Sequence, residues 1–323
     1  MRRVFCVLWF VKRWILIITP LLALSSFFLI AGKNDEVSTV TNIPQGKLFV
    51  PSIPAEPAFA GEKVPLKDPD VIERFDKELL VNTFWHSNTI LTLKRTNRYF
   101  PIIEPILKKN GVPDDFKYLC VIESGLANVV SPAGASGFWQ FLESTGKKYG
   151  LEINDEVDER YNLEKATEAA CLYIKSNYSR FGSWTLAAAA YNMGENGVER
   201  QLKAQGVKSY YDLYLNQETS RYIFRMLAVK EIYSHPEAYG FLLDSDQLYS
   251  PLNVRTIQVD SVVNNWAKFA QEHGTNYKHL KLLNPWIRDP MLKNRNMKTY
   301  KVLLPATATK LEVEVDETIP AEE

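Results

Sequence analysis

The segment YLCVIESGL, residues 118–126, places one carboxylate inside an otherwise apolar run. Burial of an unpaired carboxylate is costly, so Glu123 must either have a partner or be kept protonated. An ordinary glutamate has a pKa of about 4.3 and is ionised at pH 7, but apolar surroundings raise the pKa. A protonated Glu123 has the chemistry of a general acid, and cleavage of a glycosidic bond requires a proton on the leaving oxygen.

Three further segments contain residues that could act together with Glu123: SPAGASGFWQF (131–141), AAAAYNMGENGV (187–198) and ETSRYIFRML (218–227). Taken singly, each has a plain structural interpretation as a turn, a packed helix end or an ordinary helix. Their joint appearance, in this order after the Glu-Ser pair, is a much stronger signal of function.

From about residue 98 to residue 235 the chain resembles the lytic transglycosylases with a lysozyme-like fold, of the membrane-bound murein transglycosylase D type. The resemblance rests on the Glu-Ser pair, GFWQ, Ala-Tyr-Asn, the segment ETSRYIFRMLAVKEI and the text STGKKYGL at 144–151. Two places depart from the family pattern: Trp139 stands where many members have Met, and MGENG replaces Ala-Gly-Pro-Gly after Asn192.

The resemblance implies cleavage of the β-1,4 bond between N-acetylmuramic acid and N-acetylglucosamine, without a metal or organic cofactor. No water is added: the muramic C6 hydroxyl attacks C1 and leaves a 1,6-anhydro end. Glu123 would serve as general acid and base. The substrate-binding residues implied are Ser124, Trp139, Gln140, Tyr191, Asn192 and Tyr222, with Tyr222 facing the acid.

A second catalytic carboxylate, which most glycosidases use, has no clear candidate in the sequence. The acids that follow Glu123 (Glu143, Glu152, Asp155 and Glu156) lie in polar stretches typical of solvated loops. The absence of a second acid fits assistance by the substrate's own 2-acetamido group. Two other functions stay open: a wall-binding scaffold without turnover, and a lysozyme-like hydrolase that uses water.

The fold predicted is mainly α: a lysozyme-like all-helical domain over residues 68–240, followed by a small βααβ module over 250–306. Helical periodicity runs from Asp70 to about Pro236, with Pro101 and Pro105 expected to break one helix. VRTIQV and KTYKVLLP are predicted strands flanking two short helices, an order that resembles a LysM peptidoglycan-binding repeat. The module either binds glycan or is a degenerate spacer.

The remaining segments are an N-terminal anchor or signal (1–32), a proline-containing linker (33–67) and an acidic tail (307–323). Residues 14–32 carry no charge and follow four basic residues, which favours an uncleaved membrane anchor over a cleaved signal peptide and places the rest of the chain outside the cytoplasm. The resemblance to murein transglycosylases implies that this is the periplasmic side of a bacterial envelope. The second half of the linker is equally consistent with an arm packed on the domain. We therefore expect peptidoglycan strands and the membrane as partners.

Charge and cysteine content argue against two other classes of protein, nucleic-acid-binding proteins and small disulfide-rich proteins. Subtracting the four N-terminal basic residues from the 38 basic side chains leaves 34 against 38 acidic ones. This slightly acidic remainder has no basic block, which argues against a nucleic-acid partner. Three cysteines are too few for a disulfide framework, and a bond between Cys120 and Cys171 is left open.

Overall fold

The computed structural model describes residues 50–307, which are mostly helical. The predicted anchor at 1–32, residues 33–49 and the tail at 308–323 lie outside the described residues. Within residues 50–307, no helix combines the length and the apolar character needed to cross a bilayer.

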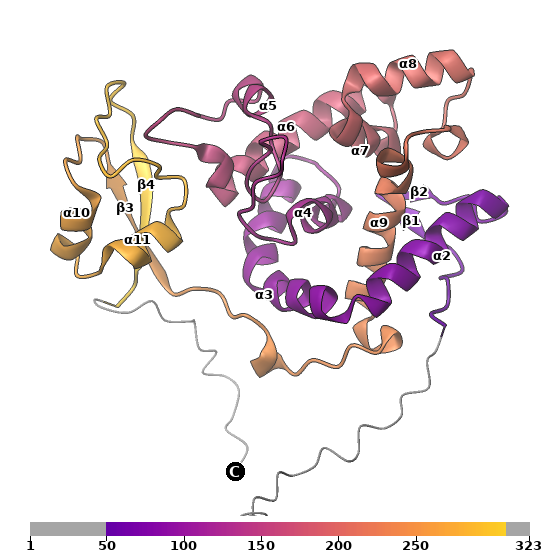
Figure 1. Cartoon of the computed structure of the whole chain (residues 1–323), viewed down its shortest axis with the longest axis horizontal. Helices are drawn as coiled ribbons and strands as arrows, with labels where there is room; N and C mark the ends of the chain where they lie inside the picture. Colours follow the sequence, from indigo (N-terminus) through magenta and orange to yellow (C-terminus); the bar gives the residue numbers. More distant parts are fainter. Residues whose placement is uncertain (1–49, 308–323) are drawn as a thin grey trace, which may run out of the picture. The chain divides into compact units, whose positions relative to one another are not determined.

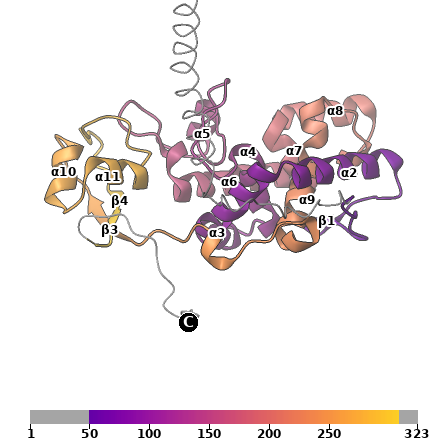
Figure 2. The ribbon, with the colours of Figure 1, turned by 60° about the horizontal axis from the view of Figure 1, so that its bottom comes forward.

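The helices and strands follow one another along the chain as a helical block and then a small mixed group (Figures 1 and 2). The elements of the helical block are β1 (Ala58–Phe59), β2 (Glu62–Lys63), α2 (Pro69–Phe84), α3 (His86–Lys109), η1 (Asp114–Phe116), α4 (Lys117–Ser124), α5 (Glu143–Lys148), η2 (Glu159–Tyr161), α6 (Leu163–Phe181), α7 (Trp184–Met193), α8 (Glu195–Gln205), η3 (Tyr210–Asp212), α9 (Gln217–Ser234) and η4 (Pro236–Tyr239). The later elements are η5 (Ser245–Gln247), β3 (Val254–Val259), α10 (Trp266–Glu272), α11 (Tyr277–Leu283) and β4 (Tyr300–Pro305).

The helical block is built around α9, which packs along α2 and also against α4 and α7 (Figure 1). Helix α6 packs between α3 and α7. Four fully buried alanines, 187–190, lie at the centre of α7 and let neighbouring helices approach closely. Residues 68–240 contain helices and only isolated β-bridges, so the predicted mainly α character of this range is confirmed.

Helix α3 runs unbroken through both prolines, so the predicted break at Pro101 and Pro105 is wrong. Each proline removes one backbone N–H, but both lie on the exposed face of the helix, where water can hydrate the carbonyls released. Ile103 and Leu107 on the opposite face are fully buried, and α3 packs against α6 there. The buried apolar face outweighs the local cost of the prolines.

Residues 50–67 form an arm that packs on the helical block, which is the second of the two interpretations of this segment. Phe59 of β1 is fully buried in the main core. The Ala58 carbonyl accepts from Lys230 Nζ at 2.9 Å, and the Ala60 N–H donates to Asp115 Oδ2 at 2.6 Å. The arm is therefore an integral part of the folded block.

The C-terminal group has the predicted βααβ order. Strands β3 and β4 pair antiparallel, from Val254 opposite Pro305 to Val259 opposite Tyr300. Helices α10 and α11 pack on each other, and α11 packs on β4 (Figure 2). A second hydrophobic core, centred on the fully buried Trp266, also takes in Val157 and Tyr161 from the helical block.

Candidate active site

Helix α4 carries Glu123 at its C-terminal end. Its buried residues are Tyr118, Leu119, Cys120 and Val121, and they fix the helix in the main core. The helix ends at Gly125, whose positive φ of 60° suits the left-handed turn that glycine adopts without strain. This ending leaves Glu123 half-buried at the edge of the core.

The carboxylate of Glu123 accepts a hydrogen bond at Oε1 from the buried hydroxyl of Tyr222 on α9. Burial raises the pKa of Glu123 above its ordinary value. The Tyr222 hydrogen bond and the charge of Arg225 act in the opposite direction, whereas the nearby charge of Glu218 raises the pKa further. The net result is a raised pKa, as a general acid working near neutral pH requires.

Three side chains satisfy the backbone carbonyls at the end of α4. Arg225 donates to the Ile122 carbonyl and Arg95 to the Gly125 carbonyl, each at 2.8 Å. The Ser124 hydroxyl donates to the Cys120 carbonyl at 3.0 Å. Carbonyls at a helix C-terminus lack partners within the helix, so these bonds hold the turn that positions Glu123.

Tyr191 and Asn192 lie at the end of α7 and link it to neighbouring segments. The Tyr191 hydroxyl donates to the Trp139 carbonyl at 2.7 Å. Burial raises the pKa of Tyr191 well above its usual value, and the charge of Glu123 is the next cause, so the two side chains lie within electrostatic range. Asn192 accepts from Thr219 Oγ1 at 2.8 Å, which ties α7 to α9.

Gln140 lies in the loop between α4 and α5 in a positive-φ conformation of 48°. Its amide donates to the carbonyls of Gly137 at 2.7 Å and Val129 at 3.0 Å, so the side chain is bound to its own loop. Gly137 is required where it stands, because a Cβ there would lie 1.9 Å from the Arg160 carbonyl oxygen. The loop's conformation is therefore closely specified.

Trp139 does not line a groove, which corrects the expectation that it contacts substrate. Its side chain is fully buried, and the indole N–H donates to Thr167 Oγ1 at 2.8 Å. A tryptophan with its one donor satisfied inside the core is a packing residue. Phe138, 4% exposed, is likewise buried and packs edge-on against Tyr99. Cys120 and Cys171 are both buried free thiols.

The structure brings Glu123, Tyr222 and Tyr191 together, and Asn192 joins them through α9. Gln140 is connected to this group through both of its chain neighbours: the Trp139 carbonyl accepts from the Tyr191 hydroxyl, and the Phe141 ring packs against the Tyr191 ring. The sequence reasoning missed Glu218 and Arg225. They lie four residues before and three residues after Tyr222, and that helical spacing was a usable signal.

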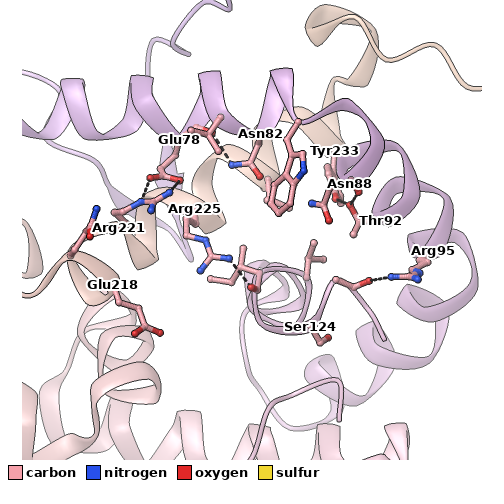
Figure 3. Close-up of a pocket in the computed structure, with 17 residues that line it drawn as sticks. Glu78, Asn82, Asn88, Thr92, Arg95, Ser124, Glu218, Arg221, Arg225 and Tyr233 are labelled. Atoms are coloured by element: carbon pink, nitrogen blue, oxygen red, sulfur yellow. Dashed lines mark hydrogen bonds and ion pairs between the residues drawn. The ribbon is translucent and has the colours of Figure 1, made fainter. Parts of the chain in front are cut away.

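A polar cavity of about 520 Å³ opens at the end of α4 (Figure 3). Ser124 and Gly125 line it, whereas Glu123 itself is not among the lining residues. The other walls of the cavity come from α2, α3 and α9. Figure 3 shows Arg225 extending from α9 toward the end of α4. Within residues 50–307, no three His, Cys, Asp or Glu side chains are grouped closely enough to hold a metal ion.

Two known domain families match parts of this chain. Residues 100–213 match the Transglycosylase SLT domain, and residues 255–308 match the Soluble lytic transglycosylase C-terminal LysM-like domain. The chain therefore contains an SLT transglycosylase domain followed by a LysM-like domain, which confirms the resemblance found in the sequence.

Among curated proteins, the chain is homologous to membrane-bound lytic murein transglycosylase D of Escherichia coli strain K12. The two are 29% identical over 244 residues, which is 73% of this chain and 52% of the relative. The chain thus spans about half the length of the curated relative that it matches.

Two solved structures are similar in part. An inactive mutant of lytic transglycosylase Slt from Pseudomonas aeruginosa is 20% identical, with a TM-score of 0.37 over 47% of this chain and 26% of that chain. The 70 kDa soluble lytic transglycosylase from Escherichia coli is 21% identical, with a TM-score of 0.37 over 46% and 26%.

Proposed function

We propose that the protein is a peptidoglycan lytic transglycosylase that uses Glu123 as its general acid and base. The observation that carries the proposal is the position of Glu123: it is half-buried, has a raised pKa and is bound to Tyr222 at the end of α4. The SLT domain over residues 100–213 and the homology to a lytic murein transglycosylase support the same reaction class.

In the proposed reaction, protonated Glu123 gives its proton to the glycosidic oxygen as the bond from muramic C1 to that oxygen breaks. The resulting carboxylate then takes the proton of the muramic C6 hydroxyl as that oxygen bonds to C1. The proton count balances without water, and the product carries a 1,6-anhydro end. The 2-acetamido group stabilises the charge at C1, as in other substrate-assisted glycosidases.

The neighbouring residues take supporting roles in this proposal. Tyr222 orients the carboxyl group and stabilises its ionised form between the two steps. Tyr191 and Asn192 bind the N-acetyl group, and Gln140 hydrogen-bonds the sugar after its amide turns away from the loop carbonyls. Ser124 contacts substrate where it lines the cavity.

The proposed location is the periplasmic side of a bacterial envelope, with residues 1–32 as a membrane anchor. The relative's name, membrane-bound lytic murein transglycosylase D, is consistent with this location. We also propose that the LysM-like domain helps to hold the enzyme on glycan strands.

The test is the mass of the products released from purified sacculi. Muropeptides with anhydro ends support the proposal, whereas reducing ends, heavier by one water, indicate a hydrolase. No release by a folded protein that still binds sacculi indicates a scaffold. Glu123→Gln should abolish release and spare binding. The matched control is Glu199→Gln, which changes a carboxylate on α8 that is 60% exposed and should leave release unchanged. Full activity in Glu123→Gln would refute the assignment of the acid.

A further inference from the structure

The polar cavity at the end of α4 is built largely by parts of the chain outside the SLT match at 100–213. Only Val121, Ile122, Ser124 and Gly125 come from the matched range. The other walls are contributed by α2, the Trp85 junction, α3 and α9 (Figure 3). The ligand chemistry of this cavity is therefore set by residues that the SLT match does not include.

Two arginines give the cavity a net positive lining. Arg221 is neutralised by the buried Glu78, to which it donates from two nitrogens. Arg95 and Arg225 have no carboxylate partner among the described ion pairs. Each donates one hydrogen bond to a backbone carbonyl at the end of α4. A guanidinium group has five N–H donors, so both retain donors for a ligand.

Glu218 is the one other acidic side chain in the lining. It is exposed, and its Oε1 accepts from Asn192 Nδ2 at 3.2 Å. The lining arginines therefore outnumber the lining carboxylates by one. When Glu123 holds its proton, it adds no negative charge to offset this excess.

Trp85 supplies a flat apolar surface in the same lining. Its side chain is 58% exposed although it is among the largest apolar residues of the chain. It lies at the junction of α2 and α3, so its position is fixed by two helices. An exposed aromatic face beside arginines and the amides of Asn82 and Asn88 suits a sugar ring that carries an acidic substituent.

We propose that this cavity is a subsite for a carboxylate borne by the glycan strand, bound by Arg95 and Arg225 beside Trp85. The proposal rests on the proposed function, because the cavity begins at Ser124, one residue from the acid. Peptidoglycan offers two sources of this chemistry. One is the free lactyl carboxylate of a muramyl residue that has lost its peptide, and the other is a carboxylate of an intact peptide stem.

The experiment compares four sets of soluble glycan strands with the full-length protein. Two sets lack peptide stems, one with free lactyl carboxylates and one with those groups amidated by methylamine. Two sets keep the stems, again with carboxylates free or amidated. We expect wild-type KM to be about 10- to 100-fold lower for a free set than for its amidated partner, as the loss of a charge-assisted hydrogen bond predicts.

Arg95→Met is the primary variant, because Arg95 contacts Gly125 and not the acid. It should bring the ratio of the two KM values close to one, and Arg225→Met should do the same. Arg95→Lys keeps the charge and should keep most of the ratio, which separates binding from a loss of folding. Arg180→Met, on the surface of α6 and outside the cavity lining, should leave the ratio unchanged.

If the KM for the amidated set exceeds the KM for the free set only among the stem-free strands, the ligand is the lactyl carboxylate. If it does so only among the stem-bearing strands, the ligand is a carboxylate of the peptide stem. A wild-type ratio of one, or an unchanged ratio in both Met variants, overturns the subsite. If no strand is cleaved, the proposed function fails. In that case the Kd values for the free and amidated strands are compared instead, and tighter binding of the free strands supports the carboxylate subsite without any cleavage.

Discussion

The arm at residues 50–67 makes a stability prediction that is independent of the active site. Glu62 of β2 lies at the N-terminus of α7, where its carboxylate accepts from the backbone N–H groups of Trp184 and Thr185. The hydroxyls of Ser183 and Thr185 donate to the same carboxylate at 2.9 and 2.8 Å. One side chain thus satisfies four donors and places a negative charge at the positive end of a helix.

Glu62→Ala should destabilise the protein by about 3 kcal/mol. The two backbone N–H groups lose roughly 1 kcal/mol each, and the charge at the helix terminus accounts for about another 1 kcal/mol. The two hydroxyls add little, because they lie 2.9 Å apart and can bond to each other. Glu62→Gln keeps an acceptor oxygen and loses the charge, so it should cost about half as much.

Urea unfolding followed by circular dichroism measures this effect, with Glu56→Ala as the matched control. Glu56 lies in the same arm with an exposed side chain, and its removal should change the free energy of unfolding by less than about 0.5 kcal/mol. If Glu62→Ala falls within that same margin, the Glu62 carboxylate does not stabilise the N-terminus of α7.

Three further predictions concern the site itself. Burial raises the pKa of Glu123 in the folded state, so folding is penalised by its charge at pH 7.5 and not at pH 4. Glu123→Gln should therefore stabilise the protein more at pH 7.5 than at pH 4 in urea unfolding, and equal effects at both pH values would contradict this reasoning. Tyr222→Phe removes a hydrogen bond that lowers the pKa of Glu123, so the alkaline limb of the pH–rate profile should move to higher pH; a limb that stays in place would show that the bond does not tune the acid. Gly137→Ala should lower the free energy of unfolding by more than about 2 kcal/mol in thermal unfolding, because its Cβ would lie 1.9 Å from the Arg160 carbonyl oxygen. Gly134→Ala is the control: its Cβ would have nothing within 4 Å, so only the backbone strain of about 1 kcal/mol is expected. Similar losses in the two variants would show that the loop relaxes.

Much of the fold could be predicted from the sequence, because the local sequence signals agree with the helices and strands that the structure contains. The predicted strands VRTIQV and KTYKVLLP contain the observed β3 and β4, and the helix predicted to end at Gly182 does so. The break predicted at Pro101 and Pro105 failed for a tertiary reason, since the packing of α3 on α6 offsets a local preference. The sequence left the docking of the arm open as one of two interpretations, because Glu62 meets α7 across more than a hundred residues of chain.

Some residues of the candidate site could likewise be predicted from the sequence, and others could not. Glu123 could be found because an acid in an apolar helix is locally anomalous, and Tyr222 because its segment resembles a known family. Trp139 was misassigned because a tryptophan has both a surface that suits sugars and a volume that suits cores, and only the position of Thr167 distinguishes them. Arg95 offered no local signal at all, since an arginine on a helix surface is unremarkable until its contact with the Gly125 carbonyl is seen.

The LysM-like domain is joined to the helical block by hydrogen bonds that its own sequence does not indicate. Its loop after α11 is bound by the segment 152–161 of the helical block: Asp158 N–H donates to the Trp286 carbonyl at 2.9 Å, and Glu156 accepts from the Lys293 N–H at 2.7 Å. Arg160, paired with Asp158 in the same segment, donates to the carbonyls of Gly134 and Phe141 on either side of Gln140. One continuous series of contacts therefore connects the LysM-like domain to the Gln140 loop.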